Sequence, residues 1–179
     1  PIIALLPGSR KQEIQNMLPL MLLASKKLSS YRFVVICSKN IKRSFYESYM
    51  LDYNSIDLIY DKNILNSVTA AVVTSGTATL ELAILGIPQV VCYRLNFVSF
   101  LLAKFLINIK YISLVNILGE REIVKELIQN QFTVDNIIAE INMILNKSNR
   151  NLILDGYSQV IRILGQPGFF DKTSNEIYR

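Results

Sequence analysis

Short apolar runs alternate with mixed segments along the first half of the chain. Five runs rich in Val, Ile and Leu are predicted to be buried strands, at residues 2–6, 31–37, 56–60, 70–74 and 87–93. Because strands that alternate with helices form right-handed βαβ units, the pattern predicts an α/β fold, a Rossmann-like doubly wound parallel sheet. The carboxyl ends of these strands then share one edge, where ligands of such sheets bind.

Amphipathic segments are expected to form the helices around this sheet. Between the strands we expect helices at residues 39–51 and 77–85, and later at residues 133–145, capped by Thr133, and 148–164. Pro19 is expected to start a fresh helix after a short turn. Proline suits the first helical position and disrupts a helix interior.

The pattern is less regular after the fifth predicted strand. Residues 96–107 are predicted to form an unusually apolar helix, residues 111–118 an extended segment, and residues 121–129 another amphipathic helix. Residues 1–165 then make one domain and residues 166–179 a loose tail.

Residues 72–81 combine a strand end, a polar turn and the start of a helix. Ser75, Gly76 and Thr77 supply hydroxyls and backbone N–H groups at a helix N-terminus, which favours an anion. Glu81 lies one turn further on, where a carboxylate can accept hydrogen bonds from two ribose hydroxyls. The stretch therefore indicates a nucleotide diphosphate site. The alternative is an ordinary capped helix, with Ser75 or Thr77 as its N-cap.

Composition narrows the chemistry. The chain has 179 residues, 51% hydrophobic, a net charge of +5 and no histidine, so histidine bases, Ser-His-Asp triads and most zinc sites are excluded from it. Cys37 and Cys92 lie in apolar runs and are expected to be free buried thiols. Scattered basic residues favour phosphates or an anionic membrane surface over nucleic acid. The start at Pro1, without an initiator Met, suggests a piece of a longer protein.

Five motifs follow one another along the chain: residues 5–10 (LLPGSR), 75–81 (SGTATLE), 88–94 (PQVVCYR), 111–118 (YISLVNIL) and 121–129 (REIVKELIQ). Together they resemble the lipid-A-disaccharide synthase family, and the resemblance covers roughly the first 129 residues. It implies a GT-B glycosyltransferase, of which this chain is the C-terminal, nucleotide-binding half.

The resemblance also implies a reaction. A synthase of this family joins UDP-2,3-diacylglucosamine to 2,3-diacylglucosamine 1-phosphate (lipid X) with inversion, forms the lipid A disaccharide and releases UDP. It needs no metal or other cofactor, and its general base belongs to an N-terminal half that this sequence lacks. The expected partners are these substrates, that missing half, the inner-membrane surface and a second copy in a homodimer. The expected location is cytoplasmic, peripheral to the inner membrane.

The resemblance assigns roles to particular residues. It implies catalytic roles for Arg10, which would neutralise the leaving phosphates, and for Asn116, which would bind a phosphate or the donor sugar. Val115 stands before Asn116 where the family usually has proline. Residues implied to bind the UDP-sugar are Gly8, Ser9, Ser75, Gly76, Thr77, Ala78, Glu81, Tyr93, Arg94 and Gln129.

Structural alternatives stay open for most of these residues. Arg10 can form a surface salt bridge to Glu13, Glu81 can complement a helix dipole, and Asn116 can shape a turn. The apolar segment Phe97 to Ile107 can meet acyl chains, or be core or a partner-covered surface.

Two other functions remain alternatives. One is another GT-B enzyme that uses a UDP-sugar, such as a peptidoglycan N-acetylglucosaminyl transferase or a 2-epimerase. The epimerases carry site histidines, which this chain lacks. The other is a non-catalytic UDP-binding or membrane-tethering subunit.

Overall fold

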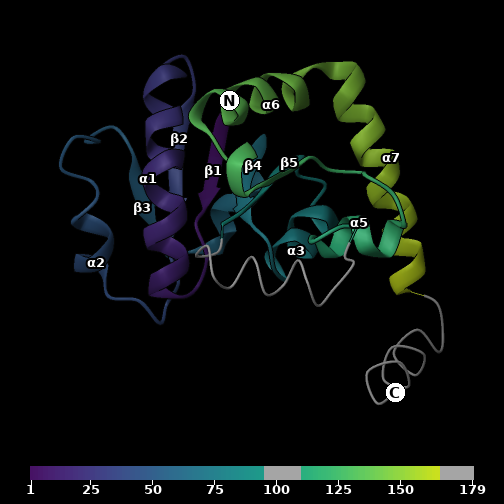
Figure 1. The fold of residues 1–179 in the computed structure, drawn as a ribbon, viewed down its shortest axis with the longest axis horizontal. Helices are drawn as coiled ribbons and strands as arrows, with labels where there is room; N and C mark the ends of the chain where they lie inside the picture. Colours follow the sequence, from purple (N-terminus) through teal and green to yellow (C-terminus); the bar gives the residue numbers. More distant parts are fainter. Residues whose placement is uncertain (95–109, 166–179) are drawn as a thin grey trace.

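A parallel six-stranded sheet forms the centre of the computed structural model, which describes residues 1–94 and 110–165 (Figure 1). All the neighbouring strands pair in parallel, in the order β3-β2-β1-β4-β5-β6. The strands are β1 (Ile2–Leu6), β2 (Arg32–Ile36), β3 (Asp57–Ile59), β4 (Ala70–Thr74), β5 (Gln89–Tyr93) and β6 (Glu126–Ile128). The predicted α/β, Rossmann-like fold is confirmed.

The strand order reverses direction between β1 and β4. Strands added after β1 extend the sheet to one side as far as β3, and strands from β4 onward extend it to the other. Leu5 in β1 is paired with Val35 on one side and Val72 on the other, and all three are fully buried. Burial on both faces explains why these strands are continuous apolar runs. Ligands of doubly wound sheets bind beyond such a reversal.

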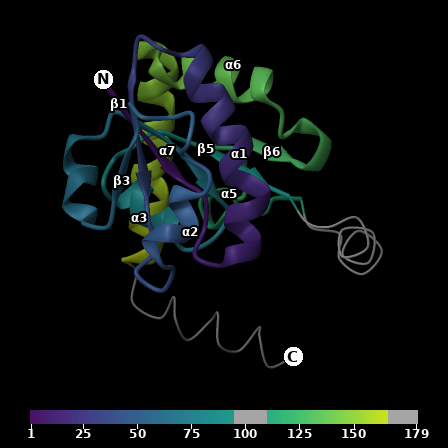
Figure 2. The ribbon, with the colours of Figure 1, turned by 90° about the vertical axis from the view of Figure 1, so that its left-hand side faces the viewer.

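Helices cover both faces of the sheet (Figures 1 and 2). On one face α1 (Lys11–Lys27) packs beside α6 (Val134–Leu145), and on the other α3 (Ala78–Ile84) contacts α5 (Leu114–Gly119) and α7 (Lys147–Leu164). Thr133 accepts a hydrogen bond from Asn136 N–H and so caps α6, as the sequence predicted.

Helix α1 continues through Pro19, so the predicted break at this residue is wrong. Proline removes one helical hydrogen bond and costs about 3 kcal/mol in a helix interior. The helix buries an apolar face that includes Ile14, Leu18 and Met21, each with no exposed surface. Burial of three such side chains contributes about 5–9 kcal/mol, which exceeds the cost of the proline.

The helix expected at residues 39–51 is much shorter in the structure. Helix α2 spans only Arg43–Glu47. In this stretch Ile41 is buried, Phe45 and Tyr49 are partly buried, and Tyr46 has no exposed surface. Its hydroxyl accepts a 2.9 Å hydrogen bond from the Ser38 N–H, which ties α2 to the end of β2.

Two predictions for residues 111–129 are also wrong. The segment expected to be extended forms α5, and the segment expected to be a helix contains β6 followed by the 3-10 turn η2 (Gln129–Gln131). Strand β6 pairs with β5, with Leu127 opposite Cys92. Tertiary pairing with β5 therefore outweighs the helical spacing of apolar residues in this stretch.

A close approach joins α5 and α7 around Ile123. A β-carbon at Gly156 in α7 would stand 2.5 Å from the Ile123 Cγ2, and one at Gly119 in α5 would collide with the Cδ1 of the same side chain. Only glycine leaves room for Ile123 at both positions. The Ile123 side chain is therefore packed between α5 and α7.

Candidate functional site

A cavity of about 680 Å³ opens at the carboxyl edge of the sheet, where the strand order reverses. The turns after β1, β2, β3 and β4 all contribute to it. Its lining residues are Leu6, Gly8, Ser9, Arg10, Glu13, Ile36, Cys37, Ser38, Lys39, Tyr60, Asp61, Lys62, Thr74, Ser75, Gly76, Thr77, Ala78 and Glu81. The structure thus brings together eight predicted site residues: Gly8, Ser9, Arg10, Ser75, Gly76, Thr77, Ala78 and Glu81.

The turn between β1 and α1 is fixed by Glu13. Its Oε2 accepts hydrogen bonds from the N–H groups of Ser9, at 2.9 Å, and Arg10, at 3.2 Å. Gly8 has a φ of +112°, and a β-carbon there would lie 2.5 Å from the same Oε2. The N–H groups of Ser9 and Arg10 are therefore occupied, and what these two residues offer a ligand is the Ser9 hydroxyl and the Arg10 side chain.

Arg10 is held only loosely. Its side chain is 84% exposed, and its Nη1 lies 3.6 Å from Glu13 Oε1. The surface salt bridge considered as an alternative is thus present. Exposed pairs of this kind contribute about 0–1 kcal/mol, so the guanidinium can reorient toward an anion in the cavity.

The turn between β4 and α3 presents backbone donors. The Ser75 N–H donates to Cys92 O at 3.1 Å, and the Ser75 hydroxyl donates to Ile112 O at 2.7 Å. Both protons of Ser75 are therefore used within the protein. By contrast, the N–H groups of residues 76–78 donate to no other residue in the described part of the chain. Thr77 occupies the N-cap position of α3 without a side-chain cap.

Glu81 faces the same cavity from α3. Both of its carboxylate oxygens accept from Lys62, whose Nζ lies 2.8 Å from Oε1. Lys62 begins the 3-10 helix η1 (Lys62–Ser67), which Asp61 caps by accepting from the Asn63 N–H at 2.9 Å. The pair is partly solvated, since the side chains are 58% and 36% exposed, and it holds the carboxylate at the cavity mouth.

Neutral groups form part of the cavity wall. Burial raises the pKa of the Cys37 thiol to about 11, partly offset by the charge of Arg43, and burial also raises the pKa of the Tyr60 hydroxyl. The Thr74 hydroxyl is buried at the end of β4 and has no hydrogen-bond partner among the described residues. The thiol stays protonated at neutral pH and is unsuited to act as a nucleophile. Both cysteines are free and buried, as predicted.

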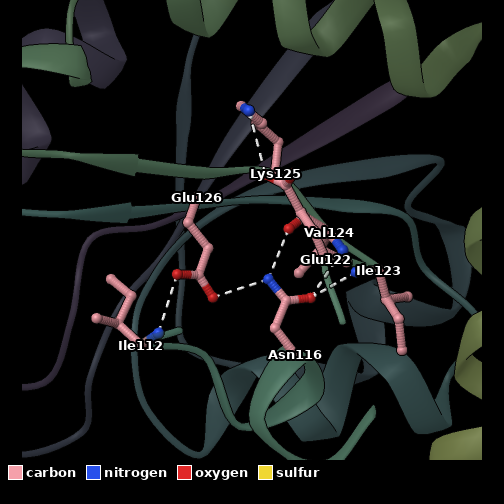
Figure 3. Close-up of polar contacts among 7 residues, drawn as sticks. All are labelled: Ile112, Asn116, Glu122, Ile123, Val124, Lys125 and Glu126. Carbon is pink, nitrogen blue, oxygen red and sulfur yellow. Dashed lines mark hydrogen bonds and ion pairs between the residues drawn. The ribbon is translucent and has the colours of Figure 1, made fainter. Parts of the chain in front are cut away.

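Asn116 does not line the cavity. It has no exposed surface, and its amide makes four hydrogen bonds (Figure 3). Its Oδ1 accepts from the N–H groups of Ile123 and Val124 at 2.8 and 2.9 Å, and its Nδ2 donates to Val124 O and Glu126 Oε1, both at 2.8 Å. The expectation that Asn116 binds a phosphate or sugar is therefore corrected, because its amide is saturated and buried.

Three other predicted residues also lie outside the cavity lining. Tyr93 is half-buried at the end of β5, and Arg94, which follows it, is exposed. Gln129 begins η2 with a left-handed φ of 52°, and its buried Nε2 has no partner among the described residues. The structure does not bring these three together with Arg10 and Glu81. The apolar segment Phe97 to Ile107 lies outside the described residues.

Sequence reasoning assigned no site role to the cavity residues that follow β2 and β3. They are Ser38 and Lys39 after β2, and Tyr60, Asp61 and Lys62 after β3. The sequence feature that could have identified them is their position along the chain. Each lies at or just after the carboxyl end of a strand, and these ends form the ligand-binding edge of the sheet.

Membrane-spanning helices and clusters of metal-binding side chains are both absent from residues 1–94 and 110–165. No helix there is long and apolar enough to cross a bilayer. No group of three or more Cys, Asp or Glu side chains there is arranged to hold a metal ion.

Comparison with solved structures shows a glycosyltransferase fold. TarM superposes with a TM-score of 0.63 at 15% identity, over 97% of this chain and 34% of that one. The spinosyn rhamnosyltransferase SpnG superposes with a TM-score of 0.59 at 14% identity, over 90% of this chain and 41% of that one. These likenesses establish a Rossmann-like unit of the GT-B type.

Comparison with protein sequences identifies the family. The family model for lipid-A-disaccharide synthetase matches residues 1–170. The lipid-A-disaccharide synthase of Psychromonas ingrahamii is 35% identical over 161 residues, which cover 85% of this chain and 42% of that protein. That of Francisella tularensis subsp. tularensis is 34% identical over 92% of this chain and 49% of its own length. The chain thus spans somewhat less than half the length of these relatives, and it belongs to the lipid-A-disaccharide synthase family.

Proposed function

We propose that this chain is the donor-binding half of a lipid-A-disaccharide synthase and that its cavity holds the UDP of UDP-2,3-diacylglucosamine. The observation that carries the proposal is the shared cavity. Arg10, the turn at residues 75–78 and Glu81 all line it, in a chain of this family. These groups supply a cation, backbone donors and a carboxylate, which match the phosphates and the ribose hydroxyls of a nucleoside diphosphate.

The proposed reaction is an inverting glycosyl transfer. A hydroxyl of 2,3-diacylglucosamine 1-phosphate attacks the anomeric carbon of the donor sugar, and UDP leaves from the opposite face as that bond breaks. The proton of the hydroxyl goes to a general base of the other half of the enzyme. Charge builds on the leaving diphosphate. Arg10 and the N–H groups of residues 76–78, which have no acceptor among the described residues, stabilise it. In this proposal no metal takes part.

The two halves of the enzyme have different roles in this proposal. The described half binds the nucleotide, and the other half supplies the base and the acceptor site, so the chain alone binds UDP without transferring sugar. Because both substrates carry acyl chains, the enzyme works at the cytoplasmic face of the inner membrane, where the net charge of +5 favours an anionic surface. We also propose that two copies of the enzyme form a homodimer.

Calorimetric titration of the chain with UDP, ADP, GDP and TDP tests the nucleotide assignment. We expect UDP to bind at micromolar to low millimolar concentration and the other nucleotides to bind more weakly. Absence of UDP binding to a folded sample, judged by circular dichroism, would contradict the proposal.

Turnover needs the other half. A chimera in which this chain replaces the matching segment of the Psychromonas ingrahamii enzyme should form the disaccharide and release UDP. A chimera that binds UDP but transfers no sugar, next to an active parent enzyme, would favour the non-catalytic alternative.

A further inference from the structure

We propose that Glu126 is a positioning residue: its buried carboxylate sets the turn at residues 75–78 in place before the nucleotide arrives. The inference rests on the proposed function, because it assigns a purpose to that turn. Glu126 lies in β6, outside the cavity lining, and only 6% of its surface is exposed.

The Glu126 carboxylate accepts hydrogen bonds from three donors in residues 112–116. Its Oε2 accepts from the Ile112 N–H, and its Oε1 accepts from the Ser113 N–H, both at 2.9 Å (Figure 3 draws the bond to Ile112). Oε1 also accepts from Asn116 Nδ2 at 2.8 Å. One side chain of β6 therefore holds the chain that leads into α5, from Ile112 to Asn116.

That segment in turn holds the cavity turn. The carbonyl of Ile112 accepts the Ser75 hydroxyl at 2.7 Å, and the N–H of the same residue donates to Glu126. Ser75 is the first residue of the turn whose next three N–H groups are free among the described residues. A continuous path of two hydrogen bonds thus runs from Glu126 through Ile112 to Ser75.

No cation among the described residues pairs with the Glu126 carboxylate. Its neighbour in sequence, Lys125, pairs instead with Glu122 at 3.1 Å. The carboxylate of Glu126 is balanced only by N–H donors within the described residues, which makes its burial costly. A carboxylate accepts all three donors at once, whereas an amide would set its own NH₂ against one of them. The acceptor-only chemistry of Glu126 therefore suits the fixing of Ile112.

The test is a double-mutant cycle on the chain, with Glu126→Gln, Ser75→Ala and both together. UDP affinity is measured by calorimetry, and hydrogen exchange is measured without ligand at the amides of Ser75, Thr79 and Leu80, which are hydrogen-bonded at this turn. We expect each single change to weaken UDP binding about tenfold and the double change to weaken it no more than about twofold further, because both break one path. Exchange at these three amides should rise in all three variants.

Ser25→Ala is the matched control. Ser25 is buried in α1, its hydroxyl donates to Leu22 O at 2.7 Å, and it neither lines the cavity nor contacts the path described here. This variant should lose stability while the UDP affinity and the exchange of the Ser75, Thr79 and Leu80 amides stay unchanged. A loss of affinity in Glu126→Gln that only follows its loss of stability, as in the control, would overturn the proposal.

The outcomes separate the two proposals. Effects that multiply to about a hundredfold in the double variant, or unchanged exchange at the Ser75, Thr79 and Leu80 amides, would overturn the positioning role. Failure of the unaltered chain to bind UDP would instead overturn the proposed function, and the exchange data would still decide whether Glu126 sets the turn. If Glu126→Gln does not fold, Ser75→Ala alone must raise the exchange of these amides for the proposal to stand.

Discussion

The Nζ of Lys62, at the start of η1, lies 2.8 Å from Oε1 of Glu81 in α3. The two residues are 19 positions apart in sequence and meet because β3 and β4 end at the same edge of the sheet, on either side of β2 and β1. Both residues line the cavity. A nucleotide that reaches Glu81 must therefore share this carboxylate with Lys62 or displace the ammonium.

Glu81→Gln should weaken UDP binding by about tenfold or more, since hydrogen bonds to a charged acceptor contribute roughly 1.5–3 kcal/mol. The fold should be spared, because a partly exposed ion pair contributes only about 0–1 kcal/mol. Calorimetry gives the affinity, and thermal melting reports on the fold. Lys62→Met is the matched control, because it breaks the same pair but leaves the carboxylate in place. Equal affinity in Glu81→Gln and the unaltered chain would remove Glu81 from the site.

Arg10→Ala should lower turnover of the Psychromonas chimera by more than tenfold, because a lost donor to developing charge costs roughly 2–4 kcal/mol. Steady-state kinetics should show the loss in kcat more than in KM. Arg10→Lys keeps the charge but not the planar fork, so its activity should fall between the two. Activity of Arg10→Ala within threefold of the parent would exclude the role.

Gly8→Ala should destabilise the protein by at least about 2 kcal/mol, because a left-handed φ is strained for alanine and its β-carbon would strike Glu13. For a chain of this size the melting temperature should fall by roughly 4–8 °C. Gly165→Ala provides the comparison: it lies at the end of α7 with an ordinary φ of −81°, and it should change stability by less than about 0.5 kcal/mol. Similar melting temperatures for the two variants would contradict the geometry of the turn.

Stability should decline above pH 9. Burial raises the pKa of the Cys37 thiol from 9.0 to about 11 and that of the Tyr46 hydroxyl from 10.0 to about 12. Since the folded-state pKa lies above the unfolded one, each group's contribution is complete below the unfolded value and is lost as pH rises toward the folded value. Urea unfolding between pH 7 and pH 11 measures the decline, and Cys37→Ala should make it shallower. A midpoint that stays constant to pH 11 would argue against burial of these groups.

Most of the sheet was predictable from local pattern. The strands β1, β2, β4 and β5 are runs of branched apolar residues between turn signals, and parallel pairing follows from the helices between them. The turn at residues 75–78 was also visible, because a strand, a polar turn and a helix follow one another within ten residues. These features depend on residues close in sequence.

The errors come from contacts between residues far apart. The amide of Asn116 looked available for a ligand, but Glu126 and the backbone of Val124 bind it. The pairing of β6 with β5 and the burial that carries α1 through Pro19 depend on packing partners that no local spacing reveals. Likewise, the ion pair between Lys62 and Glu81 joins turns that follow two different strands, so local spacing does not reveal it.

Because Ile123 packs between Gly119 and Gly156, the residue tolerated at each of these three positions depends on the residues at the other two. A larger residue at either glycine meets the same branched side chain, so it is accommodated only if position 123 becomes smaller at the same time. Related sequences should therefore change at these sites in concert, with a compact residue at 123 wherever one glycine has been replaced. In a library randomised at all three codons, most stable variants should combine a larger residue at position 119 or 156 with a smaller residue at position 123.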